Sequence, residues 1–182
     1  MAFHGAGERR VEEVRMRPND RRSSAFDALM ALGDTPMWVV TTADGVRRAG
    51  CLVGFATQIS IEPRRFLVGL SKANYTYTVA QHSEHLAVHL LAPEGVALAQ
   101  LFGSETGHAI DKFGHCEWHT GPNSMPILVG AAGWFVGRIV GSHDLGDHVG
   151  FLLAVTAAAG PDDGARALRY HDVAMLQAGT AP

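Results

Sequence analysis

The chain has 182 residues, of which 47% are hydrophobic and 18% charged, a composition typical of one globular domain and too apolar for an intrinsically disordered protein. Its formal net charge of -3 argues against a protein that wraps nucleic acid along a basic face, and no apolar run approaches the roughly 20 residues of a membrane helix. Residues 1–25 contain no apolar segment of a secretory signal, so we expect a soluble, cytoplasmic protein that binds neither membrane nor nucleic acid.

The N-terminal region, residues 1–24, mixes arginines with acidic residues, a pattern typical of a solvated helix or a frayed arm. The folded domain is expected to span residues 25–182. It would begin with a short helix over Ala25–Leu32, whose apolar residues fall on one helical face.

The first half of this domain has the pattern of antiparallel strands. A β-branched and aromatic run over Met37–Thr42 predicts a strand, and the pair Asp44-Gly45 predicts a tight hairpin turn after it. One long strand is expected over Arg48–Ser60, and a further apolar strand over Phe66–Leu70.

In the second half, short helices are expected between strands. The pattern predicts a helical turn over Thr76–Gln81, a strand over His85–Leu91 and a helix over Gly95–Phe102. Two further strands, Trp134–Val140 and Val149–Val155, would flank a connecting segment. At least six short strands with few helices predict a mainly β barrel with helical connections rather than a βαβ array.

The ten histidines make metal binding the first site hypothesis to test. The segment His115–His119 holds several potential ligands, and His82, His85 and His89 form a second group, but neither group has the spacing of a known zinc motif. On a strand, His85 and His89 would lie about 13 Å apart, too far for one ion. We therefore expect scattered surface and core histidines and no metal site.

Motifs for nucleophilic catalysis and for dinucleotide binding are missing. The sequence has no G-x-S-x-G, and neither G-x-G-x-x-G nor G-x-x-x-x-G-K follows a predicted strand. Cys51 and Cys116 make no disulfide framework and have no evident base partner, and Cys51 is expected to be a small core residue. A Rossmann or P-loop enzyme is therefore not expected.

Two segments favour binding of a flat, phosphorylated ligand. Around Gly50 and Gly54 the residues are small enough for a planar ring to approach the main chain, and Thr57 and Gln58 could hydrogen-bond its edge. The run Ser71–Thr76 gathers hydroxyls, an amide and a cation at a predicted helix start, which suits a phosphate. An ordinary polar turn is the alternative interpretation of that run.

Several stretches, in the same order along the chain, resemble the flavin reductase-like family of FMN-binding split barrels. The resemblance covers roughly Leu29–Leu176. Pro36–Gly45 is similar to the family's opening hairpin, Gly50–Pro63 to its flavin-binding strand with the closing S-x-x-P, and Ser71–Thr76 to its phosphate segment. Leu86–Leu91 and Leu98–Phe102 are similar to the strand and helix that follow. Asp111–Phe113 resembles the K-F loop, Gly146–His148 the G-D-H turn, and Ala167–Tyr170 the terminal P-L-x-Y.

The resemblance implies a mainly β, split β-barrel fold with short connecting helices, and a role for each matching residue. The isoalloxazine ring would be lined by Val53, Gly54, Phe55, Ala56, Thr57 and Gln58. The ribityl chain and phosphate would be held by Ser71, Lys72, Asn74 and Thr76, with the pocket closed by Lys112 and Phe113. The nicotinamide would be faced by His148 and Tyr170, with His148 as the implied catalytic residue that positions it or supplies a proton.

The activity implied by the resemblance is that of an NAD(P)H-dependent flavin reductase, a homodimer that binds FMN, or FAD, and transfers hydride to it. Such a protein can serve as the reductase component of a two-component, flavin-dependent monooxygenase. The alternative is an FMN-binding electron-transfer or redox-sensing protein without efficient NAD(P)H turnover; a structural or metal-linked module is a third hypothesis. Departures favour the alternative, since Leu52, Gly54 and Phe55 stand where family members often carry a hydroxyl.

Overall fold

The computed structural model describes residues 18–161 and 163–179, and the chain divides into two units after Asp34. In the first unit, helix α1 (Pro18–Leu32) begins earlier than the predicted helix and ends at the same residue. Its apolar residues Phe26 and Leu29 are exposed. The part of the predicted arm in residues 1–17 lies outside the described residues.

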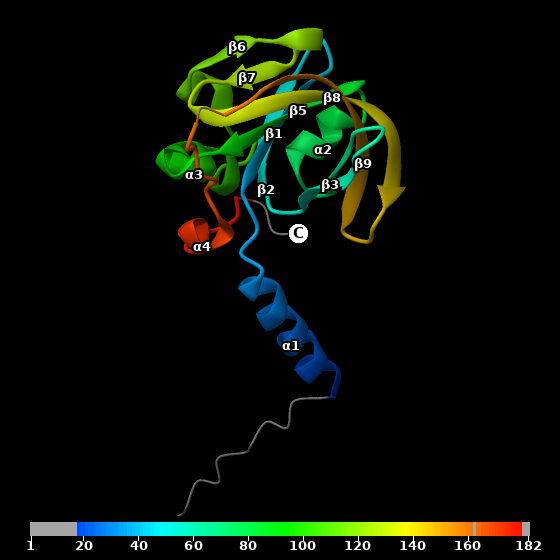
Figure 1. Cartoon of the computed structure of the whole chain (residues 1–182), viewed down its shortest axis with the longest axis vertical. Helices are drawn as coiled ribbons and strands as arrows, with labels where there is room; N and C mark the ends of the chain where they lie inside the picture. The colour runs from blue at the N-terminus through cyan, green and yellow to red at the C-terminus, as the bar shows by residue number, and fades with distance from the viewer. Residues whose placement is uncertain (1–17, 162, 180–182) are drawn as a thin grey trace, which may run out of the picture. The chain divides into compact units, whose positions relative to one another are not determined.

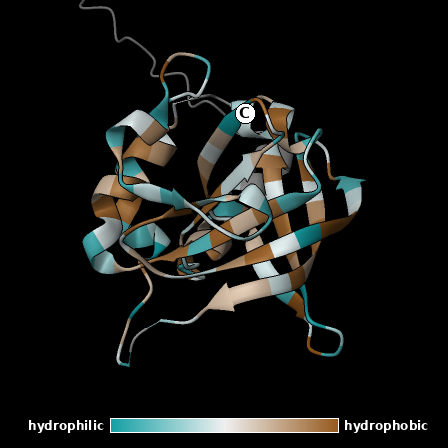
Figure 2. Ribbon diagram, turned by 90° about the horizontal axis from the view of Figure 1, so that it is seen from above, coloured by the Kyte–Doolittle hydropathy of each residue, from teal (hydrophilic) through white to brown (hydrophobic). Residues whose placement is uncertain are grey.

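The second unit is built on a curled, seven-stranded antiparallel sheet in the order β2-β1-β5-β8-β9-β4-β3 (Figure 1). Along its strands, hydrophobic residues alternate with more polar ones, as Figure 2 shows. A separate two-stranded sheet pairs β6 with β7. The strands are β1 (Trp38–Ala43), β2 (Arg48–Val53), β3 (Ala56–Ser60), β4 (Arg65–Ser71), β5 (His85–Leu91), β6 (Trp118–Thr120), β7 (Pro126–Leu128), β8 (Ala131–Asp144) and β9 (His148–Ala159).

Three short α-helices and three 3₁₀ turns complete this unit, and all but α4 connect strands. They are α2 (Tyr75–Ala80), η1 (Pro93–Gly95), α3 (Val96–Ser104), η2 (Lys112–His115), η3 (Pro122–Ser124) and α4 (Tyr170–Val173). Helix α2 lies in the opening of the curled sheet, where it contacts β1, β2 and β4 (Figure 1). No helix among residues 18–161 and 163–179 is long and apolar enough to cross a membrane.

Strand alternation divides the apolar side chains between two cores. On β1, Val40 faces the inside of the curled sheet, with Val68 and Leu153 from β4 and β9. Its neighbour Val39 faces the opposite side and packs with Phe102 of α3. The period of two in an antiparallel strand therefore gives β1 an apolar partner on both faces.

The single strand predicted over Arg48–Ser60 is wrong, because the chain bends at Gly54 and Phe55 to form two strands. Strand β2 pairs with β1, whereas β3 pairs with β4 at the other edge of the sheet. At the bend, the Ala56 N–H donates to the Gly54 carbonyl oxygen at 3.1 Å. β-Propensity indicates extended backbone along the whole segment and carries no information on a change of pairing partner.

The segment Gly141–His148, predicted to connect two strands, belongs mostly to the strands themselves. Strands β8 and β9 run on to Asp144 and from His148, and a tight turn joins them, in which Leu145 N–H donates to the His148 carbonyl oxygen. Gly146 adopts a φ of +107°, which favours glycine. The predicted hairpin at Asp44-Gly45 and the strand over His85–Leu91 are confirmed.

A buried histidine ties β5 to its neighbours. His89 is fully buried; its Nδ1 lies 3.0 Å from the Val39 carbonyl oxygen, and its Nε2 accepts from the Leu128 N–H at 3.1 Å. These partners require Nδ1 to carry the proton and Nε2 to be unprotonated. Burial lowers the pKa of His89 from 6.5 to about 4, so the neutral ring is a structural link between β1, β5 and β7.

Candidate functional site

The free edge of β2 presents main-chain groups to a ligand. At the base of the hairpin, Asp44 N–H donates to the Arg47 carbonyl oxygen at 3.2 Å. Because hydrogen-bonded pairs recur at every second position of an antiparallel ladder, the main-chain groups of Gly50, Leu52 and Gly54 point away from β1. Strand β2 is the last strand of the sheet, so these groups face its open edge.

Gly50 of β2 and Gly54 of the bend that follows it have different surroundings. A Cβ on Gly50 would lie 2.6 Å from Cε1 of Phe102, so Gly50 makes room for a core ring. A Cβ on Gly54 would meet only Thr35 Oγ1, at 3.9 Å. The flavin hypothesis requires room for a ring beside the main chain, and Gly54 has that room at the end of an open strand edge.

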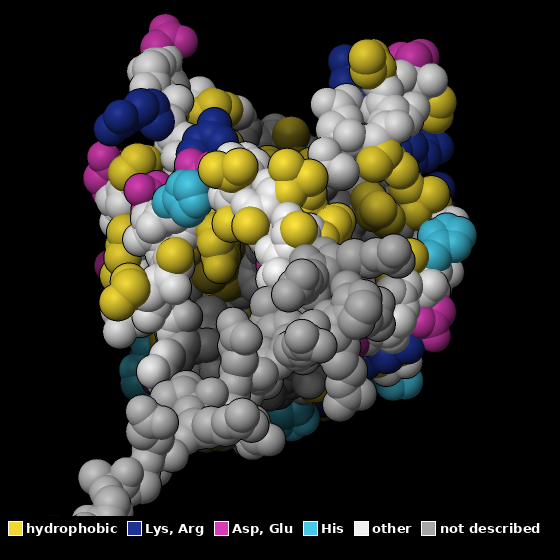
Figure 3. Space-filling model, turned by 90° about the horizontal axis from the view of Figure 1, so that it is seen from below, with side chains coloured by type: hydrophobic (Ala, Val, Ile, Leu, Met, Phe, Trp, Pro, Cys, Tyr) yellow, Lys and Arg dark blue, Asp and Glu magenta, His cyan; other side chains and the backbone are white. Residues whose placement is uncertain are grey.

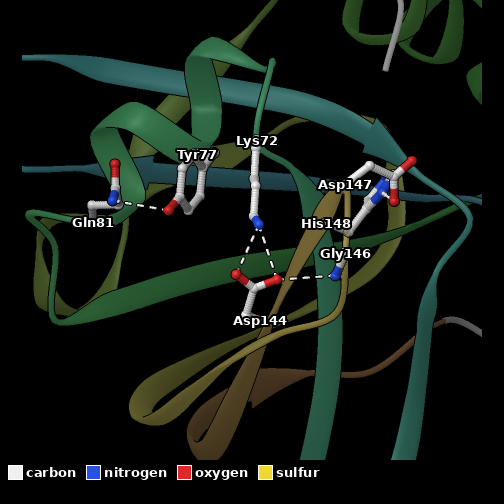
Figure 4. Close-up of polar contacts among 7 residues, drawn as sticks. All are labelled: Lys72, Tyr77, Gln81, Asp144, Gly146, Asp147 and His148. Carbon is white, nitrogen blue, oxygen red and sulfur yellow. Dashed lines mark hydrogen bonds and ion pairs between the residues drawn. The ribbon is translucent and has the colours of Figure 1, made fainter.

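Phe55 and His148 meet beside this edge, although they lie far apart in the sequence. Their rings form an edge-to-face pair with centroids 5.1 Å apart. A Cβ on Gly69 would lie 3.2 Å from the Phe55 Cβ and 3.9 Å from the His148 Cδ2, so the two rings lie close over the β4 backbone. Asp147 Oδ1 lies 2.9 Å from the His148 Nδ1, so Nε2 is the ring nitrogen that could contact a ligand (Figure 4).

An ion pair joins the two turns next to this aromatic pair. The Lys72 Nζ donates to both carboxylate oxygens of Asp144 at 2.9 Å, and the Gly146 N–H donates to the same carboxylate (Figure 4). Hydrogen bonding from Lys72 lowers the pKa of Asp144. The Lys72 N–H also donates to the Asp147 carbonyl oxygen at 2.9 Å, so the turn that carries His148 is fastened to the predicted phosphate segment.

The other polar residues of that segment are largely committed to the fold. The Asn74 side chain caps α2 by accepting from Thr76 N–H, and Ser71 Oγ accepts from Ala73 N–H. Thr76 is 1% exposed and its hydroxyl interacts with the thiol of Cys51. Ser71 and Lys72 are therefore the accessible polar side chains at the start of the segment.

The remaining residues predicted to line the flavin ring differ in their exposure. The Val53 side chain belongs to the barrel interior, and Ala56 packs against the same cluster. Thr57 and Gln58 are exposed on β3, where the Gln58 amide donates to the Ser60 carbonyl oxygen at 3.0 Å. Cys51 is 3% exposed, as expected of a small core residue, and burial raises the pKa of its thiol.

Lys112 is a buried cation behind the β2 edge. It is 4% exposed, and its Nζ donates to the carbonyl oxygens of Gly50, at 3.1 Å, and Phe102, at 3.0 Å. Burial lowers the pKa of its ammonium group. Phe113, which follows it, packs edge-to-face on both Phe102 and Trp118. Both predicted pocket-closing residues thus lie on the outer side of β2.

Lys112 and Phe113 also line a cavity of about 710 Å³ between the β1–β2 hairpin, the start of α2, η2 and the β6–β7 sheet. Its wall includes Gly50, from the predicted flavin-binding strand, and Tyr75, from the predicted phosphate segment Ser71–Thr76. The Phe55–His148 pair and Lys72 are not among its lining residues. The predicted site residues therefore form two groups, one at each end of the β2 edge.

Tyr170 is not among the residues that line the cavity, and Thr35 connects it to the space at Gly54. It is 45% exposed at the start of α4, its N–H donates to the Thr35 carbonyl oxygen, and its ring lies 6.2 Å from the His171 ring. Among the described residues, no group of three or more metal-ligating side chains could hold an ion.

Sequence reasoning missed four side chains that the structure places at the two groups. Asp144 and Asp147 hold Lys72 and His148, while Arg48 and Trp118 line the cavity. Asp147 stands inside the G-D-H stretch, and Arg48 lies next to the predicted ligand-binding strand. A charged residue inside or next to a stretch that resembles the family could therefore have been predicted to belong to the site.

Comparison with known proteins agrees with these observations. The flavin reductase like domain family model matches residues 30–179. The chain is similar to "FMN reductase (NADH) RutF" of Ancylobacter novellus, with 31% identity over 163 residues, 86% of this chain and 88% of that protein. It is also similar to the "4-hydroxyphenylacetate 3-monooxygenase reductase component" of Salmonella typhimurium, with 26% identity over 171 residues, 91% of this chain and 95% of that protein.

The fold agrees as well. A crystal structure of a flavin reductase domain protein from Arthrobacter sp. FB24 superposes with a TM-score of 0.74 at 20% identity, covering 88% of this chain and 96% of that one. This likeness confirms the mainly β, split-barrel architecture. By its sequence and its fold, the chain belongs to the flavin reductase-like domain family.

Proposed function

We propose that this protein is an NAD(P)H-dependent flavin reductase that binds FMN at the free edge of β2. The observation that carries the proposal is the open space at Gly54 beside the Phe55–His148 pair, in a chain of the flavin reductase-like family. The main-chain N–H and C=O of Leu52 and the N–H of Gly54 would bond the ring edge, because the carbonyl oxygens of Gly50 and Gly54 already accept from Lys112 and from the Ala56 N–H. Side-chain hydroxyls are not needed for those bonds, so the departures Leu52, Gly54 and Phe55 are compatible with flavin binding.

Bound flavin would supply the acceptor for a hydride from NAD(P)H. The residues of this chain bind, orient and shield the reacting rings, because alignment at van der Waals distance accounts for much of such a rate enhancement. Phe55 forms a wall beside the ring. His148, held through Nδ1 by Asp147, presents Nε2 to contact the nicotinamide or to hold a proton there.

Changing His148 to alanine tests this function. We expect kcat/KM for NADH oxidation with added FMN to fall about 100-fold, the lower end of the usual effect of a positioned proton-transfer group, while FMN binding changes little. Steady-state kinetics and fluorescence titration measure the two quantities. His143→Ala, an exposed histidine on β8, is the matched control and should keep full activity. A wild-type protein that binds FMN without oxidising NADH or NADPH would instead be the electron-transfer protein of the alternative hypothesis.

For the phosphate end of the flavin we propose Ser71 and Lys72, with Asn74 and Thr76 holding the turn in shape. Lys72→Ala is expected to weaken FMN binding about tenfold, the loss of one charge-assisted hydrogen bond. Riboflavin binding should stay nearly unchanged, because riboflavin has no phosphate. Equal weakening of both ligands in a fluorescence titration would remove Lys72 from the phosphate site.

We further propose a homodimer that delivers reduced flavin to a partner oxygenase. Strand β3 is an edge strand with an exposed apolar side chain at Ile59, and two more, Phe55 and Ile61, directly flank it, of which Ile61 is 82% exposed. Hydrophobic side chains are also gathered on the face drawn in Figure 3. Such a surface favours association.

Light scattering at micromolar concentration checks the oligomeric state. The expected mass is twice 19.4 kDa, and Ile61→Glu is expected to shift the protein towards monomer because it places a charge on the apolar surface. Val46→Glu, at an apolar residue of the β1–β2 turn that is 93% exposed and lies away from β3, is the control for added charge. A wild-type monomer would contradict the dimer proposal. The relatives named as reductase components support delivery to an oxygenase partner.

A further inference from the structure

The cavity beside η2 has a wall that the proposed FMN site does not use. Arg48 of β2 places its guanidinium carbon 4.7 Å from the centre of the Trp118 ring and 5.7 Å from that of Phe113. Phe113 and Trp118 are themselves packed edge-to-face, 5.6 Å apart. A planar cation on two aromatic rings forms a shelf on which a flat heterocycle can stack.

The opposite wall is fixed by a second aromatic contact. Tyr75, the first residue of α2, lies edge-to-face on His108 with ring centroids 4.9 Å apart. A Cβ on Gly107 would lie 2.5 Å from Tyr75 Cδ1, so the loop backbone is pressed against the tyrosine ring. The floor is tied down by Thr41 Oγ1, which donates to the Pro126 carbonyl oxygen at 2.6 Å. The cavity is therefore built from packed elements.

The residues that line the cavity carry a net positive charge, whereas the whole chain is negative. The chain carries a formal net charge of -3, yet the cavity lining contains three basic residues, Arg47, Arg48 and Lys112, and one acidic residue, Asp111. Low-dielectric walls that carry charge of one sign concentrate ligands of the other sign. The lining thus favours an anion.

Of the three cations, Arg48 is the one available to a ligand. Arg47 is held by Asp44 through its Nε and Nη2, and hydrogen bonds from Arg47 lower the pKa of Asp44 from 3.8 to about 2. Lys112 is turned towards two carbonyl oxygens. The ion pair of Arg48 with Asp111 is longer, 3.5 Å, and exposed on both sides, so a phosphate can replace that carboxylate at little cost.

We infer that this cavity binds the adenosine diphosphate part of a dinucleotide, with the adenine on the Arg48–Trp118 shelf and the phosphates at the Arg48 guanidinium. A volume of about 710 Å³ lies within the range of pockets for ligands of this size, about 300–1,000 Å³. The cavity reaches Tyr75, next to the turn proposed for the flavin phosphate. The inference rests on the proposed function for its dinucleotides, because FAD and NADH carry the same adenosine diphosphate group.

Isothermal titration calorimetry with ADP on the full chain tests the site without turnover. ADP is expected to bind the wild type, and Arg48→Gln to weaken it at least tenfold. Arg138→Gln, the same change at an exposed position of β8 outside the cavity lining, should bind ADP within twofold of wild type. ADP should also alter tryptophan fluorescence, and Trp118→Phe should remove that change.

Two further comparisons identify which dinucleotide supplies the group. If it is FAD, the affinity ratio of FAD to FMN falls in Arg48→Gln; if it is NADH, the ratio of NADH to reduced nicotinamide mononucleotide falls instead. Either outcome supports the site. An absence of ADP binding at millimolar concentration, or binding that is indifferent to Arg48→Gln, overturns it. Failure of the wild type to oxidise NADH with FMN defeats the reductase proposal, and the ADP titration remains a separate result.

Discussion

Replacing His89 with leucine is expected to lower the free energy of unfolding at pH 7.5 by about 3 kcal/mol, because it leaves the buried Leu128 N–H without a partner and removes the ring's bond to the Val39 carbonyl oxygen. The Val39 carbonyl oxygen and the Leu128 N–H both bond the His89 ring, which is fully buried. Leucine fills a similar volume but offers neither a donor nor an acceptor. Urea denaturation at pH 7.5 measures the loss.

The same substitution should flatten the acid dependence of stability. The pKa of His89 is 6.5 when unfolded and about 4 in the fold, so the unfolded state binds the extra proton between these values. The stabilisation is complete above pH 6.5 and is lost as the pH falls towards 4, by about 3 kcal/mol. Denaturation curves of wild type and His89→Leu between pH 7.5 and 4 should therefore converge.

A control on the same strand separates this effect from a general loss of charge. His85 is half-buried at the start of β5, and His85→Leu should leave most of the pH dependence in place. If His89→Leu kept the full wild-type slope, the neutral ring could not be the group that makes the fold acid-sensitive.

Replacing Lys112 with methionine is expected to cost about 3 kcal/mol, since two buried carbonyl oxygens lose a charged donor. The side chain joins η2 to Gly50 of β2 and to Phe102 of α3. Methionine keeps the length and the apolar stem but donates no hydrogen bond. Thermal and urea unfolding measure the change, and FMN affinity should fall with it because the β2 edge loses its support.

The chain supplies its own matched control for this substitution, because its other lysine is Lys72. Lys72 bonds Asp144 at the surface, where an ion pair contributes little to stability, so Lys72→Met should unfold close to wild type. Equal destabilisation by the two substitutions would mean that the bonds of Lys112 do not hold the edge.

Local sequence patterns predicted several features of the site, but they did not predict which distant residues contact one another there. The sequence indicated a polar turn at Ser71–Thr76 and a histidine after a glycine turn, and both are present. It could not indicate that Lys72 binds Asp144, 72 residues away along the chain, because no local pattern encodes which distant charges meet. Equally, Arg48 and Trp118 become neighbours only when β2 and β6 are placed around η2.

What the sequence determined by itself is the type of most elements and the family. Alternation of apolar residues specified β5, and the Asp44-Gly45 pair specified the first hairpin, since both signals act over a few residues. Tertiary structure alone decided that Arg48–Ser60 divides into strands at opposite sheet edges, that Gly50 serves the Phe102 ring, and that His89 and Lys112 are buried. The physical reason is that pairing partner and burial depend on long-range packing, which overrides local propensity wherever the two disagree.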